Sequence, residues 1–336
     1  MLSLLCCTIF VLAIVPEDTG SPEPTALRAL HDSTESPVIE GDDGWLFLRS
    51  ELNFLASGPF WGQAATQVSK ARKPEWADPE LAILDFHRQL NTAGIELLLV
   101  PVPAKATVMA HKLPIESDSN NDEAMQEFMV RLRASGVDVL DLKPVLTKVN
   151  SNGVPAYLKT DTHWSPAGLK AASEEIAQWL VDKGLASRTA APLKLISRSV
   201  LMRGDLVDMQ SGTGGGPTET VMVEDLGGTA PAIAQSSPIT LLGDSHALVF
   251  SAGQDMHAKD AGLVEHLSAA IEAPIDRVAV RGSGASATRI ELLRRRDQMA
   301  GKKAVIWLFA ARDLTESDGW RVVPVMKPLM NSSEVP

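Results

Sequence analysis

Nearly unbroken apolar runs that alternate with segments of helical spacing constrain the fold of this chain most strongly. "IELLLVPVP" at 95–103 and "AVIWLFAA" at 304–311 are typical of strands that are covered on both faces. Further strand-like runs are "GVDVLDL", "PITLL" and "RVAVRG", and helical spacing of apolar residues recurs at 78–94, 121–134, 165–184 and 286–300. This alternation predicts an α/β fold with three αβα layers, in which helices cover both faces of a mainly parallel sheet.

The composition suits a folded domain and argues against two classes of partner. Of the 336 residues, 45% are hydrophobic and 22% are charged, so the chain can bury a sizeable core. The formal charge of -11 argues against binding of nucleic acid or of an anionic membrane surface by electrostatics alone. Both cysteines, Cys6 and Cys7, lie in the first apolar run, so a disulfide framework and a cysteine metal site are not expected.

The domain limits are read from the two ends of the chain. Residues 1–15 form an apolar run with the length of a signal-peptide core, and they predict a signal peptide or a membrane anchor. No basic residue precedes this run and no A-x-A site follows it, so a buried N-terminal element is the alternative. Residues 16–37 are rich in Pro, Ser and acids and predict a flexible linker, 38–325 predict one domain, and 326–336 predict a tail.

One strand-like run leads directly into Gly243-Asp244-Ser245-His246, and a helical pattern follows. A residue at the carboxyl end of a parallel strand lies where α/β folds bind ligands, and backbone amides at that edge can stabilise an oxyanion. Ser245 is therefore a candidate nucleophile. The alternative is an ordinary N-cap, because Asp and Ser favour that position in any helix.

A second motif supplies an acid and a histidine. Ser165 is an N-cap and Pro166 the first residue of a helix, so Asp161 and His163 must lie in the connection before it. In extended backbone, positions two apart project from the same face, so these two side chains are expected to touch. A carboxylate that holds one nitrogen of an imidazole leaves the other nitrogen free to act as a base.

"TDTHW" first and "GDS" later in the chain resemble the alginate O-acetyltransferase family of the AlgJ and AlgX type, within the SGNH hydrolases. In most SGNH hydrolases the acid and the histidine follow the serine instead. The stretches "GDDGWLFLRSEL", "LLVPVPAKATVMAHKLP" and "VIWLFAARDL" agree with the resemblance, which covers about residues 40–314. It implies a flavodoxin-like fold in which Ser245 is the nucleophile, His163 its general base and Asp161 the orienting carboxylate. Leu308 departs from the family pattern, because many members have an acid there.

The resemblance also implies an activity and its surroundings. It implies transfer of acetyl groups to a polysaccharide such as alginate through an acetyl-Ser245 intermediate, in the periplasm or elsewhere outside the cytoplasm. Acetyl groups would then arrive through a membrane-bound O-acyltransferase. The same triad would make an esterase if water accepted the acetyl group, and a polysaccharide-binding scaffold without turnover is a third interpretation.

Other side chains near the motifs have less specific signals. His246 is interpreted as pocket-lining or solvated, and Asp244 as a hydrogen-bond acceptor within its own turn. Trp164 and Tyr157 either stack on a sugar or pack in the core, and Trp61 carries the same two interpretations.

One oxyanion donor is expected to be the backbone N–H of Ser245, and the second has two candidate loops, 203–205 and 281–284. We prefer Arg281 and Gly282, because they follow a clear strand, although glycines that only shape a turn are an equal alternative. Five histidines show no spacing to a partner: His31, His87, His111, His257 and His266. No motif for a metal, a nucleotide or another cofactor is present.

Overall fold

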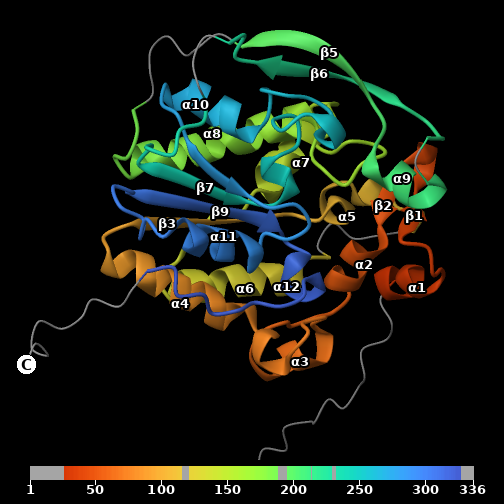
Figure 1. Cartoon of the computed structure of the whole chain (residues 1–336). Coiled ribbons are helices and arrows are strands. Elements are labelled where there is room, and N and C mark those ends of the chain that lie inside the picture. Colours follow the sequence, from red (N-terminus) through yellow and green to blue (C-terminus); the bar gives the residue numbers. More distant parts are fainter. Residues whose placement is uncertain (1–25, 116–120, 188–194, 213, 229–231, 327–336) are drawn as a thin grey trace, which may run out of the picture.

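The computed structural model describes residues 26–115, 121–187, 195–212, 214–228 and 232–326 (Figure 1). Its centre is a five-stranded sheet with the order β4-β3-β9-β7-β8. The strands are β3 (Glu96–Val102), β4 (Asp138–Val139), β7 (Ile239–Gly243), β8 (Asp276–Ala279) and β9 (Ala304–Ala310). Every neighbouring pair in this sheet is parallel. The carboxyl ends of the strands therefore meet at one edge.

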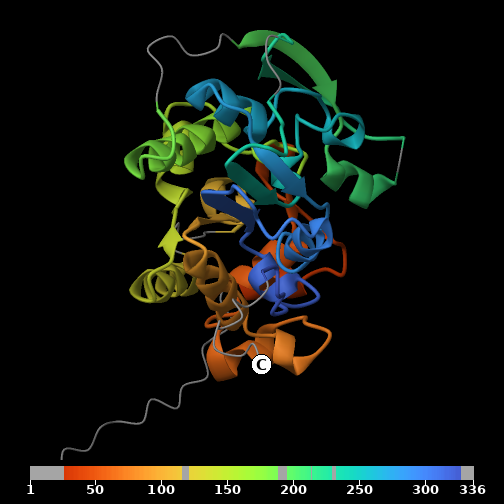
Figure 2. The ribbon, with the colours of Figure 1, turned by 60° about the vertical axis from the view of Figure 1, so that its left-hand side comes forward.

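Helices cover both faces of this sheet, which confirms the three-layer α/β fold. Helices α7 (Lys143–Ser151), α8 (Pro166–Asp182) and α10 (Leu263–Ile271) pack on one face, and α4 (Pro79–Thr92), α6 (Glu123–Ala134) and α11 (Ala287–Arg295) on the other (Figures 1 and 2). Side chains of a strand point alternately to its two faces. In β9, Ile306 and Leu308 belong to the hydrophobic core on the side of α8, and Trp307 and Phe309 belong to the core on the side of α4. The whole strand is therefore apolar and buried.

The predicted helix starts are confirmed by their caps. The Asp78 carboxylate accepts from the backbone N–H of Glu80 at 2.9 Å at the start of α4. The Ser165 hydroxyl accepts from the backbone N–H of Gly168 at 3.2 Å at the start of α8. Both caps satisfy amides that have no partner inside the helix, and the cap of α8 fixes where the preceding loop ends.

An N-terminal portion packs beside the carboxyl edge of the sheet. It contains α1 (Ala26–Asp32), the antiparallel hairpin of β1 (Val38–Glu40) and β2 (Leu46–Leu48), and α2 (Arg49–Leu55). Helix α1 lies in the range expected to be a flexible linker, and its Leu27 is buried in the core, so this part of that range is folded. The predicted signal peptide or anchor at 1–15, and residues 327–336 of the predicted tail, lie outside the described residues. No helix in the described ranges has the length and apolar character needed to cross a membrane.

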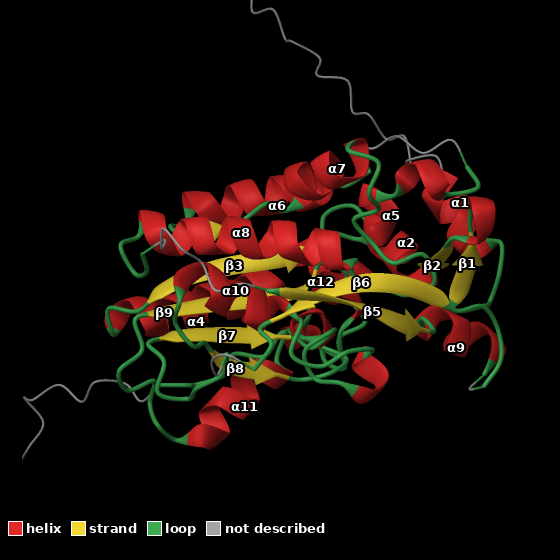
Figure 3. Cartoon of the chain, turned by 90° about the horizontal axis from the view of Figure 1, so that it is seen from above, coloured by secondary structure: helices red, strands yellow, loops and turns green. Residues whose placement is uncertain are grey.

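The region 185–238, which has no clear sequence pattern, contributes a second hairpin. Strands β5 (Ile196–Met202) and β6 (Glu219–Asp225) pair antiparallel, and α9 (Asp205–Ser211) lies between them in the sequence. Figure 3 shows α9 beside β1 and β2 at the far end of the molecule. Leu206 and Val207 of α9 pack there against Val38 and Leu46. The remaining short helices are α3 (Ala65–Val68), α5 (Lys105–Val108) and α12 (Asp313–Glu316).

The prediction of a helix after Ser245 is wrong. Only a single 3-10 turn, Ser245–Ala247, follows β7, and Phe250 then adopts φ 61°. A helix cannot continue through this left-handed conformation, so none extends past Phe250. The apolar spacing in "ALVF" instead reflects burial on all sides, since Ala247, Val249 and Phe250 are each 0% exposed.

Candidate active site

Asp161 and His163 lie in the loop before α8 and are in contact, as their spacing predicts. Oδ1 of Asp161 accepts from Nδ1 of His163 at 2.6 Å and from the backbone N–H of His163 at 2.9 Å. Both residues are buried, with 0% and 3% of their surfaces exposed. The contact fixes the ring through Nδ1 and leaves Nε2 as the only ring nitrogen that can act as a base.

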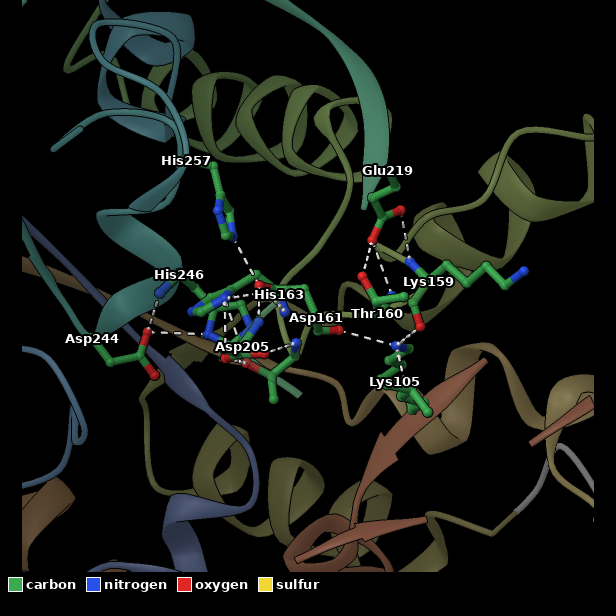
Figure 4. A network of polar contacts seen from close by, with 12 residues as sticks. Lys105, Lys159, Thr160, Asp161, His163, Asp205, Glu219, Asp244, His246 and His257 are labelled. Atoms are coloured by element: carbon green, nitrogen blue, oxygen red, sulfur yellow. Dashed lines mark hydrogen bonds and ion pairs between the residues drawn. The ribbon is translucent and has the colours of Figure 1, made fainter. Parts of the chain in front are cut away.

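The second carboxylate oxygen of Asp161 is also held by two donors (Figure 4). Oδ2 accepts from the backbone N–H of Asp205 at 2.9 Å and from Nε2 of His257 at 2.8 Å. The Asp205 carboxylate in turn accepts from the N–H and the hydroxyl of Thr162 at 2.7 and 2.5 Å. The interpretation of His257 as a histidine without a partner is therefore wrong. No local sequence pattern indicates this contact, because its partner is 96 positions away.

Charges around the pair set its protonation. Burial by itself raises the pKa of Asp161, but His163 and His257 outweigh burial and hold it well below its usual range. Burial by itself lowers the pKa of His163, but Asp161, Asp205 and Asp244 outweigh burial and hold it above its ordinary value. Asp161 is thus an anion near neutral pH, and His163 is a stronger base than an isolated imidazole.

The same charges predict the pH dependence of turnover. His163 acts as a base only when it is neutral, so kcat/KM should fall as the pH drops through its raised pKa. We expect the midpoint of this acid limb above about 6.5, the ordinary value for histidine. The measurement is kcat/KM for a neutral acetyl ester between pH 5 and 9, with thermal melting at each pH to exclude unfolding. An acid limb below that value would contradict the assignment.

Ser245 is presented by the turn after β7 and is half-buried. Asp244 braces this turn: its Oδ1 accepts from the backbone N–H of His246 at 2.8 Å, and its Oδ2 accepts from that of Ala310 at 2.7 Å. The interpretation of Asp244 as an acceptor within its turn is confirmed by the first of these bonds. The second bond ties the turn to the end of β9, so the serine is carried by the sheet itself.

The serine turn adjoins the acid–histidine pair through neighbouring rings. The centroid of the His246 ring lies 4.8 Å from that of His163 and 5.3 Å from that of Trp164. His246 is 1% exposed and burial lowers its pKa, so the solvated alternative for it is wrong. Nε2 of His163 is buried and has no hydrogen-bond partner in the described part of the chain. This nitrogen is therefore free to accept a proton.

The aromatic candidates for sugar stacking are core residues. Trp164 is 0% exposed, and Tyr157 is 1% exposed with its hydroxyl donating to the carbonyl of Pro103. Trp61 stacks on Phe128, with ring centroids 5.6 Å apart. Stacking on a sugar needs an open ring face, so the core interpretation holds for Trp164 and Tyr157.

The two candidate oxyanion loops occupy different surroundings. Arg281 forms an ion pair with Asp255 on the surface, next to Gly282 at φ 86°. Further along this loop, the amide of Gly284 already donates to Asp313 at 2.9 Å. The role of Arg281 and Gly282 in an oxyanion hole stays a prediction.

The other loop, at 203–205, packs directly on the acid. A Cβ on Gly204 would lie 1.9 Å from the carbonyl oxygen of Thr160 and 2.7 Å from the backbone nitrogen of Asp161. Only a glycine allows this approach. The loop therefore orients Asp161, and its glycine is the sequence signal that could have identified this role.

We predict that Gly204→Ala lowers turnover about 10–100-fold, because it pushes the backbone of Asp161 out of position. The same crowding should cost about 1–3 kcal/mol of unfolding free energy. Kinetics and thermal melting measure the two effects. Gly215→Ala is a matched control, since a Cβ there meets nothing within 4 Å. Equal activity of both variants would contradict this role.

Lys105, from the stretch "PVPAKATVMA", anchors the same segment from below (Figure 4). Its ammonium donates to the carbonyl oxygens of Leu46, Lys159 and Asp161 at 2.6, 3.0 and 3.0 Å. The side chain is 0% exposed, and burial lowers its pKa to about 8. The buried cation thus joins β2 to the backbone of the loop that precedes α8.

Asp161, His163 and Asp205 also bring three possible metal-ligand atoms within 4.8 Å of one another. Both oxygens of Asp161 and both of Asp205 already accept hydrogen bonds from protein donors. We therefore interpret this cluster as a hydrogen-bond network that orients His163.

Comparisons with known proteins place this chain in a family. Residues 38–311 match the model of the SGNH hydrolase-like domain of acetyltransferase AlgX. The probable alginate O-acetylase AlgJ of Pseudomonas aeruginosa is 34% identical over 144 residues, which are 43% of this chain and 32% of that relative. The match thus spans about a third of the length of this curated relative.

Two solved structures share the fold. The O-acetyltransferase domain of Pseudomonas putida AlgJ aligns with a TM-score of 0.57 at 22% identity, over 90% of this chain and 96% of that one. Pseudomonas aeruginosa AlgX aligns with a TM-score of 0.58 at 21% identity, over 86% and 65%. Since the family model covers most of the described domain, this chain belongs to the family of AlgX-type SGNH hydrolase-like acetyltransferase domains.

Proposed function

We propose that this chain is an extracytoplasmic polysaccharide O-acetyltransferase that works through an acetyl-serine intermediate. The observation that carries the proposal is the Asp161–His163 pair, with its free Nε2 beside the serine turn, at the carboxyl edge of the sheet. This combination supplies an oriented base next to a hydroxyl nucleophile.

The chemistry proceeds in two transfers. Nε2 of His163 takes the proton of the Ser245 hydroxyl while Oγ attacks the acetyl carbonyl, and the bond from the acetyl group to its donor then breaks. His163 returns the proton to the leaving group. In the second transfer His163 deprotonates a sugar hydroxyl, which attacks the acetyl-serine, and the released Ser245 oxygen regains the proton.

The electrostatics favour both transfers. Each transfer leaves an imidazolium on His163 for a moment, and the buried Asp161 carboxylate 2.6 Å away stabilises that charge. Four donors hold the carboxylate, so it does not need to reorient when the charge forms. The backbone N–H of Ser245 is a candidate oxyanion donor.

Family membership and chemistry support a proposal for the acceptor and the source of the acetyl groups. The curated relatives are named probable alginate O-acetylases, and we propose an alginate-type polysaccharide as the acceptor here. Acetyl-CoA is confined to the cytoplasm, so we propose a membrane-bound O-acyltransferase as the source of acetyl groups. The predicted signal peptide or anchor at residues 1–15 supports a periplasmic location.

The test is an acetyl-transfer assay with the full chain. It combines a chromogenic acetyl ester with mannuronate oligomers and records acetate release and oligomer mass. We expect oligomers that gain acetyl groups while the yield of free acetate falls. Acetate alone with every acceptor would identify an esterase, and binding of oligomers with neither product would identify a scaffold.

A further inference from the structure

His257 lies on the same segment as Ser245, between the serine turn and α10. Its Nε2 is 2.8 Å from Oδ2 of Asp161, and its side chain is 8% exposed. Figure 4 shows the ring reaching toward Asp161 from the opposite side to Lys105. The acid is therefore held by the segment that follows the nucleophile as well as by its own loop.

The backbone of His257 has a conformation that residues with a side chain rarely adopt. Its φ of 67° and ψ of -45° lie near the classic γ-turn, and the N–H of Ala258 closes that turn on the carbonyl of Met256 at 2.8 Å. Such a conformation is strained for a residue with a Cβ, and it persists only where the surroundings enforce it.

Hydrogen bonds around the turn enforce this conformation. The N–H of Phe250 donates to Met256 at 2.8 Å, that of Gly253 to Ala258 at 2.7 Å, and that of Ala261 to Phe250 at 2.8 Å. These three bonds join the two sides of the loop. They hold the backbone of His257 in place and so direct its ring toward Asp161.

We propose that His257 is a further positioning residue for the acid, so that Asp161 is clamped between two histidines. Without it, Oδ2 would keep only the backbone N–H of Asp205. The clamp fixes the acid relative to the segment that carries Ser245, which sets how Nε2 of His163 meets the serine. The inference rests on the proposed function, because it assigns His257 to the same acyl transfer.

Three substitutions separate the hydrogen bond from the loop conformation. His257→Gln can place its amide N–H where Nε2 lies. His257→Asn keeps a residue type that is enriched at positive φ, but its amide is too short to reach Asp161. His257→Leu removes the donor altogether.

We expect His257→Gln to keep kcat within about threefold, and the Asn and Leu variants to lose about 10–100-fold in kcat with a smaller change in KM. Melting temperatures report on folding, and His111→Gln, at an exposed histidine, is the control. A fully active Asn variant, or a Gln variant as slow as the Asn variant, would overturn the proposal.

A spectroscopic readout keeps this inference separate from the activity itself. Imidazole 1H–15N spectra of the histidine-labelled chain should show a hydrogen-bonded proton on Nε2 of His257 that shifts in Asp161→Asn. An Nε2 without that proton would overturn the clamp even in an active enzyme. If the wild-type chain transfers no acetyl group, the proposed function fails, while this spectrum still decides whether His257 holds Asp161.

Discussion

Ser245→Ala is expected to lower kcat/KM for acetyl transfer by at least about 10⁴-fold, because no other group in the turn can form the acetyl ester. The residual rate would come from the oxyanion donors and from binding alone. The fold should not change, since Ser245 is half-buried and no hydrogen bond of its hydroxyl supports the turn in the described structure. Steady-state kinetics and melting temperature measure the two effects.

The matched control for Ser245→Ala is Ser135→Ala. Ser135 follows α6, is exposed, and its hydroxyl donates only to the carbonyl of Arg131. Wild-type protein quenched in acid after mixing with the acetyl ester should carry an acetyl group on the peptide that contains Ser245. An acetyl group on another residue, or full activity of the Ser245 variant, would refute the acyl-serine mechanism.

Much of the fold is predictable because it depends on local patterns. Strands such as β9 are apolar on both faces, and the caps Asp78 and Ser165 mark where two helices begin. The contact between Asp161 and His163 is equally local, since two residues of spacing bring them to one face. Ser245 is a candidate nucleophile because a buried strand, β7, ends two residues before it.

The rest of the site depends on contacts that no local pattern encodes. Asp205 and His257 reach Asp161 from 44 and 96 positions away. His257 does so through a γ-turn that a histidine rarely adopts. Lys105 is surrounded by apolar residues, and its partners are backbone carbonyls, which any sequence would provide. Such supporting residues become visible only when the tertiary packing is known.

Asp161→Asn is expected to reduce kcat by about 10³–10⁴-fold, because the amide cannot accept from all four donors. If its NH₂ group faces His163, it meets an N–H on Nδ1, and the imidazole proton must move to Nε2, where it blocks the base. If it faces the other side, it meets the donors of Asp205 and His257. Each unsatisfied buried donor costs about 1–3 kcal/mol, so the melting temperature should fall too.

A double variant tests whether Asp161 and Ser245 act as one unit. In the proposed mechanism the acid works only through His163 on the serine, so adding Asp161→Asn to Ser245→Ala should cause no further loss of kcat. Losses that multiplied would mean that Asp161 supports a process without the serine, and the triad assignment would fail. Asp182→Asn is the control for the loss of a carboxylate, since this residue at the end of α8 accepts only from the amide of Gln178 on the surface.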